Sequence, residues 1–384
     1  MDKNFKNMLI IFLGSFLLSL FSNTLSPFIT TIKSIYNVSN GVIAMLPSVV
    51  YCASFLAIII CGKHLSLMGL KKGTYCGFLL MIAASIIIIF SKTFGFLIFG
   101  YFVSGISIGL GTLFNSMALS LLPREYQKFS AANACFGLGG ILILPIDRFV
   151  LKAGIRFNYT YLIYIAMILI YIFIFSKVDG IEIPKAGSED GAKSSFFVLK
   201  NPMVLMFLFA IFFYVGAEIS TTSWTGRFLE KFYGMSRTDV PNILLGFWIL
   251  FTLGRAVGDV ILEKVGQLKY LIVSPIIAIA GIFVMLSGKS KLQAVLGMAI
   301  IGITISVIYP ALQGYIVQHV KKEDIPPVCT CISTFNYFGA TFLTYVIGFA
   351  EGIRIIYVFI IQIFFYLYIA FVSARYLLMK KTSY

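Results

Sequence analysis

The chain has 384 residues, of which 59% are hydrophobic and only 12% are charged, and its mean hydropathy is +0.96. Soluble proteins average about 25% charged residues, so the composition excludes a soluble globular domain and predicts repeated crossings of the lipid bilayer. The net charge of +15 fits the excess of Lys and Arg in the cytoplasmic loops of membrane proteins. Nucleic-acid binding would need those charges gathered on one soluble face, so we expect no nucleic acid among the partners.

Long apolar runs dominate the chain, and a helix needs about 20 such residues to cross a bilayer. Period-2 alternation is absent, which favours helices over a membrane barrel. We therefore predict an all-α polytopic membrane protein with twelve transmembrane helices in two pseudo-symmetric six-helix bundles. In chain order the predicted spans are residues 8–30, 42–61, 73–91, 94–121, 129–152, 158–177, 202–226, 242–262, 269–287, 292–319, 327–350 and 353–378.

One long charged connection divides the chain into six spans plus six. The predicted parts are an N-terminal bundle over residues 1–177, a cytoplasmic linker over 178–200 and a C-terminal bundle over 201–384. With both termini in the cytoplasm, about 18 of the 30 Lys and Arg residues fall on the inner side and about 11 on the outer side, as the positive-inside rule requires. We expect a protein of the cytoplasmic (inner or plasma) membrane.

The loops after spans 2 and 8 resemble each other. Gly69 and Gly266 occupy equivalent places, and each is followed by basic residues. Internal repetition of this kind is typical of secondary transporters, which bind their substrates between the two repeats. The repeat therefore predicts transport.

The whole chain resembles the major facilitator superfamily. The loop Glu263-Lys264-Val265-Gly266 is similar to that family's Asp-Arg-x-Gly signature, whereas Ser66 and Leu67 replace the acidic and basic pair in the first half. That departure weakens a cytoplasmic gate latch there. The resemblance implies transport by alternating access and a monomer.

Within the superfamily, three short motifs resemble the fucose-permease-type sugar transporters. They are Tyr214-Val215-Gly216-Ala217-Glu218 followed by Trp224, Gly254-Arg255 in span 8, and Pro310 in span 10. The resemblance implies a symporter for a sugar. Such transporters usually carry an acid in spans 1 and 4, but this chain has Asn23 in span 1 and no acid in span 4, a departure that bears on proton coupling.

Span 7 carries the strongest candidate site. Tyr214, Glu218, Thr221 and Thr222 follow i, i+4, i+7 and i+8 spacing and so share one helix face, with Trp224 close behind. An acid inside a span costs at least about 2.5–3.5 kcal/mol and marks a substrate, ion or proton pathway. Because burial disfavours its charged form, we expect Glu218 to titrate during transport. The alternative is a protonated acid that hydrogen-bonds a neighbouring helix.

Polar side chains in other spans are candidate sugar contacts, because amides donate and accept hydrogen bonds and aromatic rings stack on sugar rings. These candidates are Asn23, Asn115, Asn133, Tyr309, Gln313 and Asn336. Hydrogen bonds between helices and ordinary packing explain the same residues equally well.

A cytoplasmic gate is the expected role of a second group, formed by Arg255, Asp259, Glu263, Lys264 and Gly266. Arg255 and Asp259 stand at i, i+4, so they can pair on one helix face. By the rise per residue, Arg255 lies about 8 Å away from Glu218 in depth, so we do not expect those two to be partners.

Two further predictions concern an acid–base pair and the histidines. Asp147 and Arg148, at the outer end of span 5, are expected to form an interfacial pair. The two histidines, His64 and His319, have no Cys or acid at metal-binding spacing, so we expect no metal, no cofactor and no enzymatic activity.

The chain is therefore expected to be a secondary active transporter that moves a small polar solute, first of all a sugar, with proton coupling through Glu218. The coupling ion stays open between H⁺, Na⁺ and none. The alternative function is export of amphipathic drugs or metabolites, and a third is a non-transporting sensor on the same scaffold.

Overall fold

The computed structural model describes residues 2–43, 45–62, 68–184, 195–236, 239–288 and 290–382, and within these ranges the chain forms helices and no strand. The predicted all-α fold is therefore confirmed for the described part of the chain. The loop with Ser66, Leu67 and His64, and residues 185–194 of the predicted linker, lie outside the described residues.

Two compact units divide the chain. Unit 1 comprises Met1–Gln127, Cys135–Phe197 and Lys321–Thr334, and unit 2 comprises Lys128–Ala134, Val198–Val320 and Phe335–Tyr384. Two helices are divided between the units: the one that begins at Phe129 belongs to unit 2 up to Ala134, and the one that begins at Ile325 belongs to unit 1 up to Thr334. The bounds differ in this respect from the predicted halves 1–177 and 201–384, which assigned whole helices to each half.

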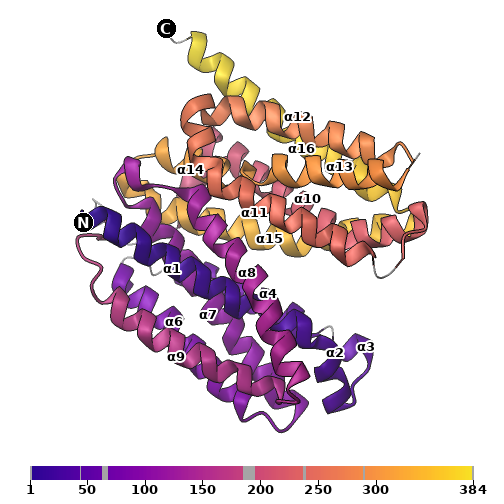
Figure 1. Cartoon of the computed structure of the whole chain (residues 1–384). Coiled ribbons are helices and arrows are strands. Elements are labelled where there is room, and N and C mark those ends of the chain that lie inside the picture. Colours follow the sequence, from indigo (N-terminus) through magenta and orange to yellow (C-terminus); the bar gives the residue numbers. More distant parts are fainter. Residues whose placement is uncertain are drawn as a thin grey trace. The chain divides into compact units, whose positions relative to one another are not determined.

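Unit 1 is built from long helices that run alongside one another (Figure 1). They are α1 (Lys3–Asn23), α2 (Leu25–Tyr36), α3 (Asn40–Ile43), α4 (Met45–Gly62), α6 (Leu70–Ile89), α7 (Phe94–Ser120), α8 (Phe129–Lys152) from Cys135 onward, and α9 (Thr160–Phe175). Within this unit α7 packs on α1, α4 and α6, and α9 packs on α1 and α6.

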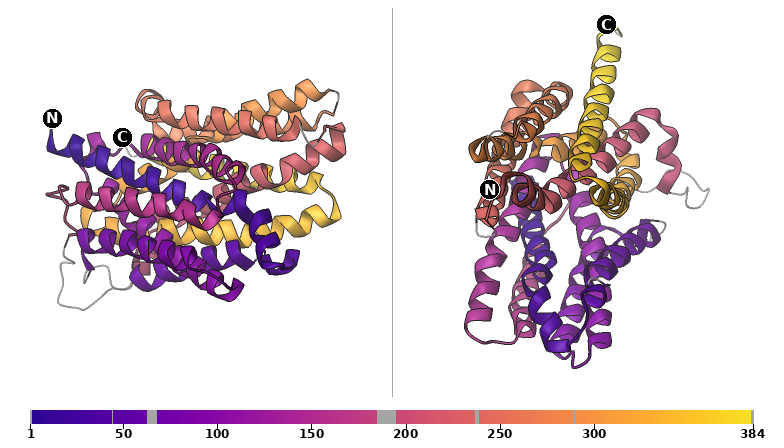
Figure 2. Two further views of the ribbon diagram at one scale, coloured as in Figure 1. Left: turned by 60° about the horizontal axis from the view of Figure 1, so that its bottom comes forward. Right: turned by 90° about the vertical axis from the view of Figure 1, so that its right-hand side faces the viewer.

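Unit 2 has a matching set of helices (Figure 2). They are α10 (Pro202–Tyr233), α11 (Asp239–Val265), α12 (Gln267–Leu286), α13 (Lys291–Ile305), α14 (Ile308–Gln318), α15 (Ile325–Ile353) from Phe335 onward, and α16 (Ile356–Thr382). Here α13 packs on α11 and α12, α14 packs on α10 and α12, and α16 packs on α10 and α12.

The helix pairings of the two units follow the same scheme, with α10, α11, α12 and α16 in the places of α1, α4, α6 and α9. The predicted loop equivalence has a structural counterpart. Gly69 and Gly266 each stand directly before a helix, α6 and α12, with φ values of +67° and +85°. Glycine tolerates positive φ without the steric cost of a Cβ, so both loops depend on it in the same way.

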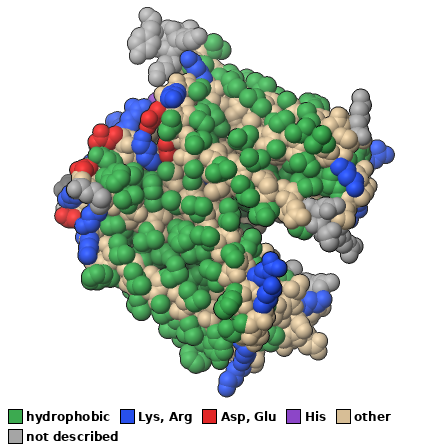
Figure 3. Space-filling model, viewed as in Figure 1, with side chains coloured by type: hydrophobic (Ala, Val, Ile, Leu, Met, Phe, Trp, Pro, Cys, Tyr) green, Lys and Arg blue, Asp and Glu red, His purple; other side chains and the backbone are tan. Residues whose placement is uncertain are grey.

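Eleven of the described helical segments are long and apolar enough to cross a membrane. The remaining predicted span, residues 327–350, corresponds to α15, which has 29 residues but carries polar residues such as Ser333, Thr334 and Asn336 along its length. Large apolar side chains are exposed on many helices, among them Phe173, Phe349 and Tyr345, and they cover most of the face in Figure 3. This surface suits lipid, and the chain is an integral membrane protein.

Two predicted spans contain a break. The span predicted over 292–319 divides into α13 and α14 at Ser306 and Val307, and the one predicted over 8–30 divides into α1 and α2 at Thr24. In both places a proline follows the break, Pro310 and Pro27. Proline has no N–H, and its ring clashes with the carbonyl four residues earlier. The backbone carbonyls of Ser306 and Asn23 therefore lack the N–H donor that a continuous helix would supply.

Close contact between α4 and α7 depends on glycine. A Cβ added at Gly109 would lie 2.6 Å from the backbone oxygen of Ser54, and one at Gly105 would lie 2.4 Å from that of Val50. The Ser54 hydroxyl uses this closeness to donate a hydrogen bond to the Gly105 carbonyl at 2.7 Å. Small residues allow such backbone approach between membrane helices.

The Gly109→Ala variant is expected to lower the free energy of unfolding by about 1–3 kcal/mol, because overpacking forces backbone shifts. Gly95→Ala in the same helix is the matched control, since a Cβ there meets nothing within 4 Å, and alanine is the better helix former. Thermal unfolding of both purified variants measures the difference. Equal unfolding temperatures for the two variants would contradict the packing role of Gly109.

Candidate functional site

The break between α13 and α14 exposes two backbone carbonyls inside unit 2. Tyr214 of α10 donates its hydroxyl to the Ile305 oxygen at 2.9 Å, and Arg255 of α11 donates Nε to the Ser306 oxygen at 3.1 Å. Buried carbonyls need such partners, because an unpaired one costs about as much as a lost hydrogen bond. The helix break therefore fixes two of the predicted site residues.

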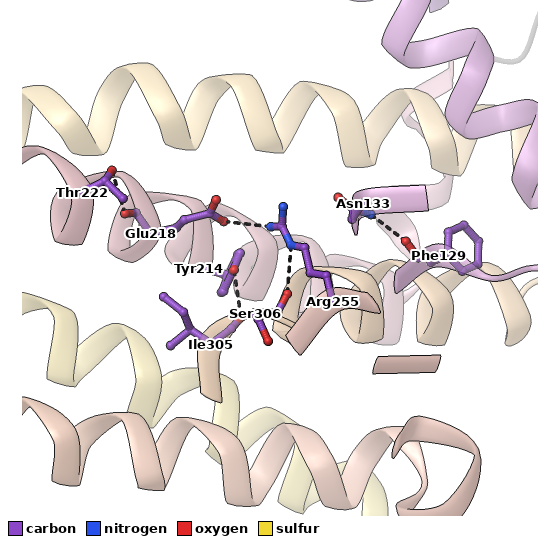
Figure 4. A network of polar contacts seen from close by, with 8 residues as sticks. All are labelled: Phe129, Asn133, Tyr214, Glu218, Thr222, Arg255, Ile305 and Ser306. Atoms are coloured by element: carbon purple, nitrogen blue, oxygen red, sulfur yellow. Dashed lines mark hydrogen bonds and ion pairs between the residues drawn. The ribbon is translucent and has the colours of Figure 1, made fainter. Parts of the chain in front are cut away.

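Arg255 also forms an ion pair with Glu218. Its Nη2 lies 3.6 Å from Oε2 of Glu218, and the side chains are 7% and 21% exposed, respectively. Figure 4 shows the guanidinium between the carboxylate and the Ser306 carbonyl. The prediction that Arg255 lies too far from Glu218 in depth was wrong. It counted only the backbone rise, whereas the long arginine side chain reaches from α11 to the carboxylate on α10.

An aromatic ring completes the surroundings of the guanidinium. The guanidinium carbon of Arg255 lies 4.1 Å from the centroid of the Phe251 ring, one turn earlier on α11. Such a cation–π contact is worth about 2 kcal/mol when desolvated. Arg255 thus has three partners of different kinds, which hold its charge in a largely buried position.

The members of the predicted stripe on α10 have different hydrogen-bond and ion-pair partners. Tyr214 and Glu218 converge with Arg255 (Figure 4), but the Thr222 hydroxyl bonds the Glu218 and Ile219 carbonyls of its own helix at 3.2 and 3.0 Å. Trp224 is half-buried with its ring 3.5 Å from a Cβ placed at Gly348 of α15. The structure therefore brings together two of the five predicted residues of this segment.

Thr221 faces α16 instead. Its hydroxyl donates to the Ala217 carbonyl at 2.9 Å and reaches Gln362 Oε1 at 3.2 Å. The Gln362 Nε2 and the Tyr366 hydroxyl beside it are buried without a hydrogen-bond partner in the described structure. Sequence reasoning missed both residues, although Gln362 is the one amide in an otherwise apolar run and could have been noticed.

Three of the predicted amide side chains donate hydrogen bonds to their own helix or to a neighbouring one. In unit 1, Asn23 donates to the Ser19 carbonyl at 2.9 Å, and Asn115 donates to the Ser15 hydroxyl at 2.8 Å. In unit 2, Asn133 donates to the Phe129 carbonyl of its own helix at 2.9 Å. These bonds match the alternative reading of packing within and between helices.

Three further predicted contacts lie on α14 and α15 of unit 2. The Tyr309 ring has its centroid 6.2 Å from that of Tyr214, which places it beside the candidate site. Gln313, one turn later, is buried, and Asn336 of α15 is half-buried.

The predicted gate residues form a second polar group around the start of α8. The Asp259 carboxylate accepts hydrogen bonds from the backbone N–H groups of Ser130 and Ala131, at 3.1 and 2.8 Å. It thereby satisfies unpaired donors in the first turn of a helix, whose partial positive charge favours an anion. The predicted pairing of Asp259 with Arg255 was wrong, because each side chain binds a different helix.

The same group includes an exposed ion pair between Lys128 and Glu263. The Ser130 hydroxyl adds a hydrogen bond to the Arg255 carbonyl at 2.8 Å. Lys264 is exposed, and Gly266 lies just beyond it at the start of α12. The first turn of α8 is thus attached to the end of α11 by hydrogen bonds and an ion pair.

Comparison with known proteins identifies relatives along most of the chain. A family model described as Major Facilitator Superfamily matches residues 11–344. An uncharacterized MFS-type transporter of Yersinia pestis is 30% identical over 126 residues, which is 33% of this chain and 33% of that protein, so this match spans about a third of the relative. Protein TsgA of Shigella dysenteriae is 24% identical over 289 residues, 74% of this chain and 72% of the relative.

Solved structures show the same fold. The MFS transporter FucP in the outward conformation has a TM-score of 0.82 at 16% identity, over 96% of this chain and 97% of that one. The Escherichia coli fucose:proton symporter FucP has a TM-score of 0.83 at 15% identity, with 97% and 99% covered. The proton:xylose symporter XylE, bound to 6-bromo-6-deoxy-D-glucose, has a TM-score of 0.76 at 12% identity, with 97% and 94% covered.

Proposed function

Because the chain belongs to the major facilitator superfamily, we propose that it moves a small polar solute, first of all a sugar, by alternating access across the cytoplasmic membrane. The proposed moving halves are residues 1–177 and 201–384, joined by the linker 178–200, with both termini in the cytoplasm. The proposed partners are the solute, a proton and the lipid bilayer, and the proposed working unit is a monomer.

The ion pair of Glu218 and Arg255 is the observation that carries this proposal. Two opposite charges lie 3.6 Å apart inside membrane-spanning helices, and intramembrane ionisable residues mark substrate or proton pathways by default. When Arg255 leaves the carboxylate, the remaining negative charge is costly in a low-dielectric environment, and binding a proton removes that cost. The pair can therefore exchange a guanidinium for a proton, which is the step that coupled transport needs.

The proposal of a sugar as the solute rests on the aromatic, hydroxyl and amide groups near the ion pair. The half-buried Tyr309 offers an aromatic ring beside the buried Tyr214, and hydroxyl and amide groups that donate and accept suit a polyol. Two of the solved structures with this fold are those of a fucose:proton and a proton:xylose symporter, which supports a sugar as the first solute to test. The proposed substrate or coupling residues remain Glu218, Tyr214, Thr221, Thr222, Trp224, Asn23, Asn115, Asn133, Tyr309, Gln313 and Asn336, and the proposed gate residues remain Arg255, Asp259, Glu263, Lys264 and Gly266.

Counterflow in proteoliposomes tests the solute class. Vesicles loaded with unlabelled fucose, galactose, glucose or xylose are diluted into the same labelled sugar, and a transporter of that sugar gives a transient, saturable uptake of label. Empty liposomes serve as the control. Saturable uptake with an amphipathic cation or drug and with none of the sugars would replace the sugar proposal by the export alternative.

A further inference from the structure

Asp147 is another acid within a membrane-spanning segment, and it belongs to unit 1. It lies on α8, within the membrane-spanning segment Arg124–Lys152 and two residues after Pro145. Its relative exposure is 0%, and neither carboxylate oxygen has a hydrogen-bond partner in the described structure. The expected interfacial pair with Arg148 does not form, because Arg148 lies on the exposed side of the helix and the described residues hold no ion pair of Asp147.

Three tyrosines of unit 1 lie within electrostatic range of this carboxyl group. They are Tyr101 of α7 and Tyr161 and Tyr164 of α9, all buried. The charged residues nearest on α8 itself are Arg148 and Lys152, both exposed. Among the residues that the structure describes, this carboxyl group therefore has neutral phenols within electrostatic range and no ion pair that compensates a negative charge.

The phenol hydroxyls are engaged with other partners. The hydroxyls of Tyr101 and Tyr161 bond each other at 3.0 Å. The Tyr164 hydroxyl bonds the Thr24 hydroxyl, at the break between α1 and α2. In this arrangement no donor serves Asp147, and an isolated ionised carboxylate in such a place costs several kcal/mol, so it takes up a proton instead.

We propose that Asp147 is a proton-binding site of the N-terminal half. It holds a proton in the arrangement seen here, and it releases the proton to water when the Tyr101–Tyr161 and Thr24–Tyr164 hydrogen bonds open and the phenols donate to the carboxylate instead. In that step one carboxyl O–H bond breaks, one O–H bond forms on the accepting water, and two phenol hydrogen bonds change acceptor. Proton binding stands by itself, and only its use in a transport cycle rests on the proposed function.

The proposal gives the first half an acid inside a span, which its other predicted spans lack. The predicted spans 1 and 4 contain no acid, so the search for a coupling residue there finds only amides and hydroxyls. The Thr24–Tyr164 bond links the Asp147 region to the break between α1 and α2. A movement of α2 relative to α1 would therefore reach the surroundings of Asp147 directly.

Infrared spectroscopy of the full chain in liposomes tests the proposal without any solute. The Glu218→Gln variant removes the acid that pairs with Arg255, and it should show the carbonyl stretch of a protonated carboxylic acid at about pH 7, where an ordinary aspartate is ionised, and lose it in alkaline solution. Adding Asp147→Asn should remove this band, whereas adding Glu125→Gln, which alters an exposed acid, should leave it. The measured quantity is the carbonyl band that Asp147→Asn removes and Glu125→Gln retains.

Two results would overturn the proposal. No Asp147-dependent band at about pH 7 would mean an ionised carboxylate, and a band that persists unchanged to about pH 10 would mean a permanently protonated structural residue. Should the asparagine variant fail to fold, Tyr164→Phe keeps the acid and removes one phenol, and the band should then persist to a higher pH. Because these spectra need no substrate, they succeed or fail independently of the counterflow experiment.

Discussion

The Arg255→Ala variant is expected to lower the free energy of unfolding by about 3–5 kcal/mol and to abolish transport. The loss leaves Glu218 without its countercharge, and removing one partner of a largely buried ion pair strands the other charge. The Ser306 carbonyl also loses its donor. Thermal unfolding of the purified variant and solute uptake into proteoliposomes measure the two effects.

Two companion variants sharpen this result. Arg255→Lys keeps the charge but not the forked donors, so it should recover only part of the stability. The double variant Glu218→Gln/Arg255→Ala leaves no stranded charge, so its loss of unfolding free energy should be smaller than the sum of the losses of the two single variants, by about 1–3 kcal/mol. Lys3→Ala breaks an exposed pair with Asp179 at 3.3 Å and should leave the unfolding temperature unchanged. Additive losses in the double variant would contradict a direct interaction.

The Glu218→Gln variant is expected to separate exchange from accumulation. A proton gradient of one pH unit supplies about 1.4 kcal/mol per proton, enough to concentrate a solute about tenfold in a one-to-one symporter. Glutamine fills the same space but binds no proton, so the variant should equilibrate its solute to a ratio of about one while counterflow persists. Uptake of labelled solute with and without the gradient makes the comparison.

An exposed acid serves as the control for the Glu218→Gln variant. Glu125→Gln changes an exposed acid of unit 1 and should accumulate solute as the unmodified chain does. A Glu218→Gln protein that still accumulates solute tenfold would assign coupling elsewhere, and Asp147 would be the first residue to examine. A variant that loses counterflow as well would make Glu218 a substrate ligand rather than a coupling residue alone.

The helices of this protein were predictable because apolar run length alone decides whether a segment can span a bilayer. Breaks within spans were harder. Pro27 and Pro310 were visible in the sequence, but proline-containing helices can also continue with a kink, as α8 does through Pro145. Whether a break forms depends on partners from other helices, such as the Tyr214 and Arg255 side chains that bind the freed carbonyls.

Side-chain direction explains the misjudged pairs. Arg255 and Asp259 share a helix face by spacing, yet each finds a better partner on a neighbouring helix, and spacing along one helix carries no information about its neighbours. Asp147 and Arg148 are adjacent in sequence, but consecutive helical residues point in different directions. One therefore faces the interior of unit 1 and the other faces outward.

The ending of α13 at Ile305 has an electrostatic consequence. The aligned peptide dipoles of a helix leave a partial negative charge at its last carbonyls, worth about 0.3–1 kcal/mol to a nearby cation and up to about 2 when partly buried. Arg255 donates to the Ser306 carbonyl at this position. Its positive charge is therefore balanced in part by the helix end, so Glu218 can be neutralised by a proton without leaving the guanidinium wholly uncompensated.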